Sequence, residues 1–281
     1  MLKITASILL GLILTQPVLS ATPRTALVIG NAAYQDGPLS APVRDARALA
    51  KVLRKLGFHV IEKFNLDRRG MTNAIRAFGR QLRERPGVGL FYFSGHGLQE
   101  GGINYLIPIG ASESLKEAYD LPYETVSVDY VLKAMTQVSN AVNLVFLDAC
   151  RTPPSFVKSW AKGQAIPPGM AKQSDVPGSL IAYAAAPGKP ALDGKKGKNS
   201  PYVKQLLKWI QAPNLSIADA LTEVRMAVIK ATHGQQQPQY SNALNEKFSF
   251  SGRHDLPTPP VDEPVKISCP ECPQLLRTCQ R

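Results

Sequence analysis

Residues 89–97 read GLFYFSGHG, and residues 143–150 read NLVFLDAC. Each stretch begins as a short apolar run rich in aromatic and β-branched residues, which is typical of a strand buried on both faces of a sheet. Each stretch then ends in polar and reactive residues, with His96 after the first run and Cys150 after the second. The two stretches therefore predict two buried strands that each deliver a reactive side chain at the carboxyl end.

Strand and helix patterns alternate on both sides of these runs. Further strands are expected at 25–30, 59–64, 179–184 and 247–250, and amphipathic helices at 42–56, 69–82, 128–135, 202–210 and 217–231. The glycine-rich sequence after residue 93 indicates a tight turn and a hairpin. This order predicts an α/β fold with one mainly parallel, six-stranded sheet and helices on both faces, in three layers.

The two ends of the chain differ from its body. Residues 1–21 combine Lys3, an apolar run and small residues at the end, which is the layout of a secretory signal peptide. Gln16 and Pro17 interrupt the run before it reaches the roughly 20 residues of a membrane anchor. Residues 253–281 read as a Pro-rich linker and a short Cys-containing tail, so the main domain is expected at 22–252. We expect an exported protein, periplasmic or secreted, without stable membrane insertion once the signal peptide is removed.

The chain is strongly basic, with a formal net charge of +12. Such a charge suits binding to nucleic acid, binding to anionic surfaces, or solubility. The Lys and Arg residues are spread along the chain, apart from a small cluster at Lys195, Lys196 and Lys198, and they are not interleaved with aromatic residues as in single-strand binders. We therefore expect a solvated surface, no nucleic-acid partner, and a monomer.

Three of the four cysteines, Cys269, Cys272 and Cys279, lie in the tail, which excludes a disulfide framework through the domain. They fall one ligand short of a structural zinc site. The segment CPECP resembles the CPxCP opening of the formylglycine-generating type of domain, so Cys269 and Cys272 indicate either a vestige of such a domain or a local disulfide. The sequence also lacks the clustered acidic loop of a calcium site. No cofactor or metal is expected.

His96 and Cys150 together point to nucleophilic catalysis. Reactive groups in open α/β sheets collect at the carboxyl ends of the strands, and a thiolate needs a nearby base to lower its pKa. The Gly97 amide could donate to an oxyanion. Taken singly, Cys150 reads as a small buried hydrophobe and His96 as a loop residue. Their joint placement at two strand ends favours a catalytic pair.

Several motifs in one order extend this pattern. FYFSGHG and LVFLDACR are accompanied by ALVIGNAAY, APVRDARALA, INYLIPIGA, SLIAYAAAPG and KNSPYVKQLL. Over residues 24–252 the chain resembles the caspase superfamily, in particular the bacterial metacaspase-like peptidases called orthocaspases. The resemblance implies that His96 is the general base and acid and Cys150 the nucleophile that forms a thioester. It also implies an oxyanion hole made by the amides of Gly97 and Cys150.

The resemblance further implies an acidic substrate pocket made by Asp45, Ser94 and Asp148. Paired carboxylates select Arg or Lys, so the expected activity is endopeptidase cleavage of polypeptides after a basic residue. Asp45 has a second interpretation, in which it caps or salt-bridges the first helix within the sequence RDAR. The alternatives for the whole chain are a catalytically silent binding module and a peptidase specific for Asp.

Two family properties stay open in the sequence. Some metacaspases need calcium, although no motif for it is present here. The segment 151–177 lies where the family is often cut, and its basic residues Arg151, Lys158, Lys162 and Lys172 are candidate sites of self-processing. Many metacaspase-like enzymes work uncut, and TPPSF after Arg151 departs from the Asn-rich sequence that is frequent in the family.

Overall fold

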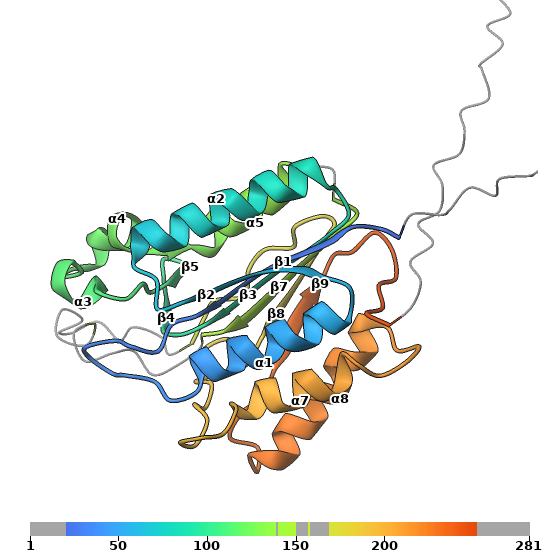
Figure 1. Ribbon diagram of the computed structural model, residues 1–281. Coiled ribbons are helices and arrows are strands. Elements are labelled where there is room, and N and C mark those ends of the chain that lie inside the picture. Colours follow the sequence, from blue (N-terminus) through green and yellow to red (C-terminus); the bar gives the residue numbers. More distant parts are fainter. Residues whose placement is uncertain (1–20, 139, 150–156, 158–168, 252–281) are drawn as a thin grey trace, which may run out of the picture.

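The computed structural model describes residues 21–138, 140–149, 157 and 169–251 (Figure 1). Its strands are β1 (Arg24–Gly30), β2 (His59–Phe64), β3 (Val88–Ser94), β4 (Gly97–Glu100), β5 (Ile103–Leu106), β6 (Val126–Ser127), β7 (Val142–Asp148), β8 (Ser179–Tyr183) and β9 (Gln239–Asn242). Its helices are α1 (Pro42–Lys55), α2 (Arg68–Glu84), α3 (Ala111–Ser114), η1 (Ala118–Asp120), α4 (Leu121–Glu124), α5 (Val128–Thr136), α7 (Pro201–Trp209) and α8 (Ile217–Ala231).

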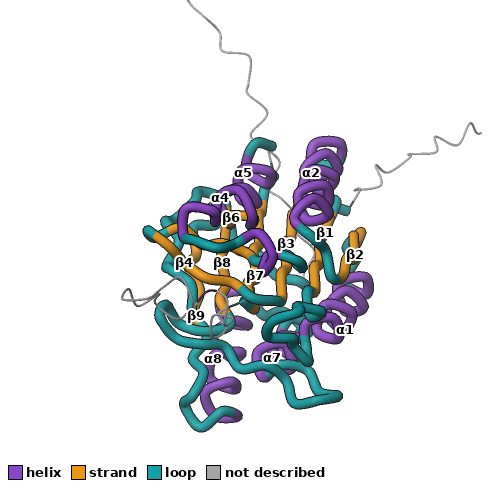
Figure 2. Tube along the Cα trace, turned by 90° about the vertical axis from the view of Figure 1, so that its left-hand side faces the viewer, coloured by secondary structure: helices purple, strands orange, loops and turns teal. Residues whose placement is uncertain are grey.

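The central sheet has six strands in the order β2-β1-β3-β7-β8-β9. All neighbouring pairs are parallel except β8 and β9, which are antiparallel. Helices α2 and α5 cover one face, and α1, α7 and α8 cover the other (Figures 1 and 2). The predicted α/β fold with a mainly parallel six-stranded sheet between two helical layers is therefore confirmed.

The two strands at the centre of the sheet are buried along their whole length. Every residue of β3 and β7 is buried, because helices pack on both faces of the sheet at this point. Helix α2 buries the stripe that its 3.6-residue period places on one side, namely Met71, Ile75, Phe78 and Leu82. The core thus fixes β3 and β7 firmly, and these are the strands that lead to His96 and Cys150.

The prediction of a strand at 247–250 is wrong, because these residues do not pair with the sheet. The sixth strand is β9, whose sequence QYSN is polar and only half-buried at the edge of the sheet. Phe248 and Phe250 are buried instead as a packed pair, with ring centroids 5.0 Å apart, and the Phe248 carbonyl accepts a hydrogen bond from the Ile217 amide. Their apolar alternation therefore reflects packing against the sheet and not strand pairing.

A second, three-stranded sheet, β4-β5-β6, begins after the two residues, Gly95 and His96, that follow β3. Strands β4 and β5 form the predicted hairpin, while β6 and the short helices between Ala111 and Glu124 were not predicted. No helix in the described residues is both long and apolar enough to cross a bilayer. The predicted signal peptide, apart from residue 21, and the tail with its three cysteines lie outside the described residues.

Candidate active site

The carboxyl ends of β3 and β7 lie side by side at the same end of the sheet. The two strands are parallel, and Ser94 is the register partner of Asp148. Beyond them, the backbone at Gly97 packs against Ala149, so that a Cβ added to Gly97 would lie 2.9 Å from the Ala149 carbonyl oxygen. Cys150, the next residue, lies outside the described residues. The segment that carries His96 therefore contacts the segment that leads directly into Cys150.

His96 is held in one orientation by a backbone carbonyl. Its ring is buried, with 4% exposed, and Nε2 lies 2.6 Å from the Gly37 carbonyl oxygen. A carbonyl oxygen only accepts, so this contact requires Nε2 to carry its hydrogen. In the neutral ring, the basic lone pair is then on Nδ1. This is the tautomer that a general base acting through Nδ1 requires.

Tyr34 supports the same histidine. Its hydroxyl accepts a hydrogen bond of 3.0 Å from the His96 amide and donates one of 2.9 Å to the Ile107 carbonyl. The two rings also meet edge to face, with centroids 4.5 Å apart. A Cβ at Gly95 would lie 2.5 Å from the Tyr34 hydroxyl, so only glycine fits beside it. Tyr34 ends the motif ALVIGNAAY, but its role was not predicted from the sequence, because a contact with a residue 62 positions away leaves no local pattern.

The structure brings the three predicted pocket residues to the same edge. Asp45 comes from α1, Ser94 from the end of β3 and Asp148 from the end of β7, and all three are fully buried. The negative charge of Asp148 reaches Asp45, whose pKa is raised to about 7 first by burial and then by Asp148. Two carboxylates thus share one buried site near His96.

Ser200 connects the two carboxylates. Its amide donates to both oxygens of Asp45, at 3.2 and 3.3 Å, and its hydroxyl donates to Asp148 Oδ2 at 2.9 Å. The Asn199 side-chain amide donates to Asp45 Oδ1 at 2.6 Å. These hydrogen bonds favour the charged form of Asp45 and lower its pKa, against the effects of burial and of Asp148.

The structure does not support the interpretation in which Asp45 caps or salt-bridges its own helix. The N-cap of α1 is Ala41, and the amides of Ser40 and Ala41 donate to Asp193, at 2.6 and 3.1 Å. The neighbouring Arg44 donates to backbone carbonyls. Within the described ranges the single ion pair joins Arg54 and Glu62. Asp45 therefore points to the site and away from its own helix end.

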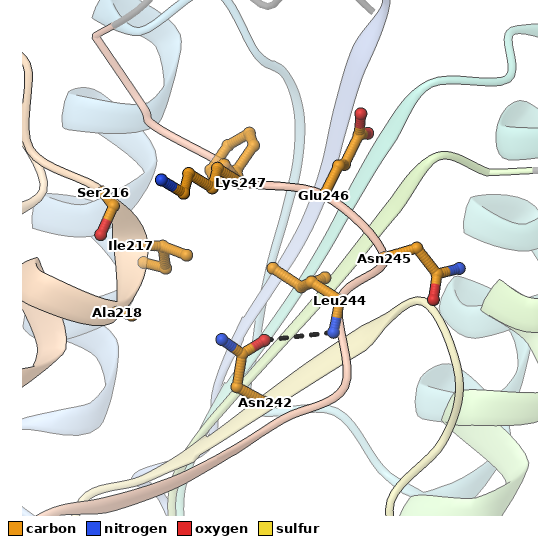
Figure 3. A pocket seen from close by; sticks show the side chains of 9 residues that line it. Ser216, Ile217, Ala218, Asn242, Leu244, Asn245, Glu246 and Lys247 are labelled. Atoms are coloured by element: carbon orange, nitrogen blue, oxygen red, sulfur yellow. Dashed lines mark hydrogen bonds between the residues drawn. The ribbon is translucent and has the colours of Figure 1, made fainter. Parts of the chain in front are cut away.

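Other parts of the described chain offer weaker candidates for a binding site. Within the described part of the chain, no group of three His, Cys, Asp or Glu side chains could hold a metal ion. Figure 3 shows a pocket of about 300 Å³ between the start of α8 and the segment after β9. It lies at Asn242, the register partner of Leu180 near the amino end of β8. His96 lies beyond the carboxyl end of β3, so the pocket lies at the opposite end of the parallel strands.

Comparisons with known proteins give matches to one family model and to two curated relatives. The family model of the caspase domain matches residues 23–249. The human mucosa-associated lymphoid tissue lymphoma translocation protein 1 is 33% identical over 135 residues, which are 47% of this chain and 15% of the human protein. The mouse homologue matches to the same extent. The chain therefore corresponds to a small part of these relatives.

Proposed function

The chain belongs to the caspase family of peptidases, and we propose that it is a cysteine endopeptidase that cleaves polypeptides after Arg or Lys. The observation that carries this proposal is the meeting of two features at one sheet edge. One is His96, oriented by the Gly37 carbonyl, and the other is the buried pair Asp45 and Asp148. The first suits acyl transfer, and the second suits a cationic substrate side chain.

In this mechanism, Nδ1 of His96 takes the proton of the Cys150 thiol, and the thiolate attacks the carbonyl carbon of the scissile bond. The amides of Gly97 and Cys150 stabilise the oxyanion of the tetrahedral intermediate. The intermediate collapses to a thioester as His96 returns its proton to the departing amine. His96 then activates water, which attacks the thioester and releases the acid product and the thiol.

Specificity comes from the carboxylate pair. A guanidinium can form two parallel hydrogen bonds with carboxylates, and a lysine ammonium acts as a compact point charge. A substrate Asp would add a third negative charge to a site in which Asp148 already disfavours the charge of Asp45. We therefore propose basic rather than acidic specificity.

The proposal is tested with the purified protein and matched fluorogenic peptides that end in Arg, Lys or Asp. The Arg and Lys peptides should be cleaved and the Asp peptide spared. Cys150→Ala and His96→Ala should each abolish cleavage, while Asp45→Asn should raise KM for the Arg peptide at least about tenfold. Equal turnover by the Cys150→Ala protein would refute the mechanism, and preferred cleavage of the Asp peptide would refute the specificity.

A catalytically silent binding module is the competing function. Labelling with a thiol-alkylating probe, followed by mass spectrometry, distinguishes this binding module from the proposed peptidase. The peptidase predicts rapid labelling of Cys150 that His96→Ala slows, because the imidazole promotes the thiolate. Labelling confined to the tail cysteines would favour the binding module.

The proposal also covers the location of the mature protein and its self-processing. We propose that the mature protein is exported and acts as a monomer without a cofactor, and that any self-processing follows a basic residue in 151–177. Most of that segment lies outside the described residues. Mass spectrometry of the active protein and of its Cys150→Ala variant tests processing, since a cut present in both would be made by another protease.

A further inference from the structure

The acidic pair is held by two residues that precede helix α7. Asn199 and Ser200 are 154 and 155 positions away from Asp45, and together they provide its hydrogen bonds within the described residues. Ser200 also donates to Asp148 through its hydroxyl. One residue therefore contacts both carboxylates, with its backbone on one side and its side chain on the other.

Ser200 is itself rigidly placed. Its hydroxyl accepts a hydrogen bond from the Val203 amide and so caps α7, while Pro201 occupies the first turn of the helix. The loop before it is tied to the start of α1, because Asp193 accepts from the Ser40 and Ala41 amides and Arg44 donates to the Lys198 carbonyl. The donors thus approach the carboxylates from a fixed direction.

The carboxylate pair needs such donors. Two buried like charges repel each other, and a buried carboxylate without hydrogen bonds tends to take up a proton. Asp148 is the charged group that faces Asp45 across the site, and the guanidinium of Arg44, the residue before Asp45 on α1, donates to the Ser40 and Lys198 carbonyls. A protonated pair would attract a basic substrate residue less strongly. The hydrogen bonds from 199 and 200 therefore bear directly on substrate selection.

We infer that Asn199 and Ser200 are positioning residues that hold Asp45 and Asp148 side by side, favour their charged form and so determine selectivity for a basic residue. This inference rests on the proposed function, because it assigns the carboxylate pair to the substrate pocket. Neither residue needs to touch the substrate. Their effect is exerted through the two aspartates.

Ser200→Ala is the first test, with Ser216→Ala as its matched control. Ser216 caps α8 through the same type of hydrogen bond, from the Asp219 amide, but has no contact with the acidic pair. Both variants lose a helix cap, so both should unfold at a slightly lower temperature. Only Ser200→Ala should raise KM for the Arg peptide, by about tenfold, with little change in kcat.

Ser200→Thr completes the series. Threonine keeps a hydroxyl and is a good N-cap, so this variant should restore a KM close to that of the wild type. An equal change of KM in Ser200→Ala and Ser216→Ala would overturn the inference, because the effect would then belong to helix capping. An unchanged KM in Ser200→Ala would overturn it as well.

Asn199→Ala gives a second readout that does not need activity. Loss of this donor should raise the pKa of Asp45 further, because a hydrogen bond that favours the carboxylate is removed. The pH range over which the stability of the Cys150→Ala protein depends on Asp45 should then move upward. Chemical unfolding at a series of pH values measures this shift, with Asp45→Asn as the reference.

The two readouts separate the two proposals. Suppose that Asn199→Ala shifts the pH range over which stability depends on Asp45, but the wild type cleaves no basic peptide. That result would refute the proposed function and leave the positioning of Asp45 by Asn199 intact. An unshifted range in Asn199→Ala would overturn the positioning role, whatever the activity.

Discussion

Gly97 and Ala149 lie in direct contact at the carboxyl edge of the sheet, one residue before Cys150. A Cβ on Gly97 would lie 2.9 Å from the Ala149 carbonyl oxygen and 3.0 Å from its Cβ, distances that real side chains hardly ever show. Backbone atoms cannot move aside as a flexible side chain can. The absence of a side chain at Gly97 is therefore what lets the His96 segment approach the Cys150 segment.

Gly97→Ala should consequently separate the two segments. We expect a loss of about 1–3 kcal/mol in the free energy of unfolding, as for other overpacked sites. We also expect kcat to fall at least about tenfold, because the His96 segment would move away from the segment that leads to Cys150. Urea unfolding and steady-state kinetics on one preparation measure both quantities. Wild-type kinetics in Gly97→Ala would contradict the close approach.

Tyr34→Phe should affect His96 without removing the ring contact. The buried His96 amide would lose its acceptor and the Ile107 carbonyl its donor, at a cost of about 1–3 kcal/mol in stability. The less firmly held imidazole should lower kcat more than it changes KM. Stability is measured by chemical unfolding and kcat with the Arg peptide.

Tyr130→Phe is the matched control. Its hydroxyl accepts a hydrogen bond from Arg76 at an exposed position, so its loss should change stability by less than about 0.5 kcal/mol and leave kcat unchanged. If Tyr34→Phe behaved like Tyr130→Phe, Tyr34 would have no role in holding His96.

The fold could be predicted from the sequence because its main signals are local. Buried strands such as β3 and β7 read as apolar runs. The predicted ranges 59–64 and 217–231 coincide with the edge strand β2 and with α8. β9 escaped prediction because an edge strand can be polar, while Phe248 and Phe250 imitated a strand by alternating toward the core. Side-chain alternation reports burial, and it does not report backbone pairing.

The site could be predicted only in part. His96, Asp45 and Asp148 follow recognisable motifs, and the structure places them at one sheet edge. Their supporting partners Tyr34 and Ser200 are tertiary contacts across 62 and 52 or more positions, and no periodicity records such contacts. Serine before Pro201 does mark a helix N-cap. That signature predicts the cap of α7 but not the hydrogen bond to Asp148.

Stability should depend on pH through Asp45. Its native pKa is raised to about 7, whereas an unfolded Asp titrates near 4. Between these values the native state holds a proton that the unfolded state has lost, so the contribution of Asp45 is most favourable below about pH 4 and declines as pH rises toward 7. The total decline should be on the order of a few kcal/mol, since one pKa unit corresponds to about 1.4 kcal/mol.

Asp45→Asn should remove this decline. Chemical unfolding between pH 4.5 and 8, a range of roughly 3.5 units that spans the expected change, should show the wild type losing stability relative to the variant. Substrate binding should follow the opposite direction, with KM for the Arg peptide falling as pH rises through about 7 and Asp45 becomes charged. Parallel stability curves for the two proteins would show that Asp45 titrates normally.

Asp193→Ala should loosen the loop that carries Asn199 and Ser200. Asp193 accepts from the amides of Ser40 and Ala41 at the start of α1, so its loss frees one end of the connection between that loop and the helix. We expect about 1 kcal/mol of lost stability, as for other helix caps, together with a higher KM for the Arg peptide.

Asp67→Ala separates these two effects. Asp67 caps α2 by accepting from the Gly70 amide at 2.7 Å, and it belongs to a helix on the other face of the sheet. Its loss should lower stability by a similar amount and leave KM unchanged. If Asp67→Ala raised KM as much as Asp193→Ala, general destabilisation would explain both results. A higher KM in Asp193→Ala alone would instead mean that the loop transmits its position to the acidic pair through the hydrogen bonds of residues 199 and 200.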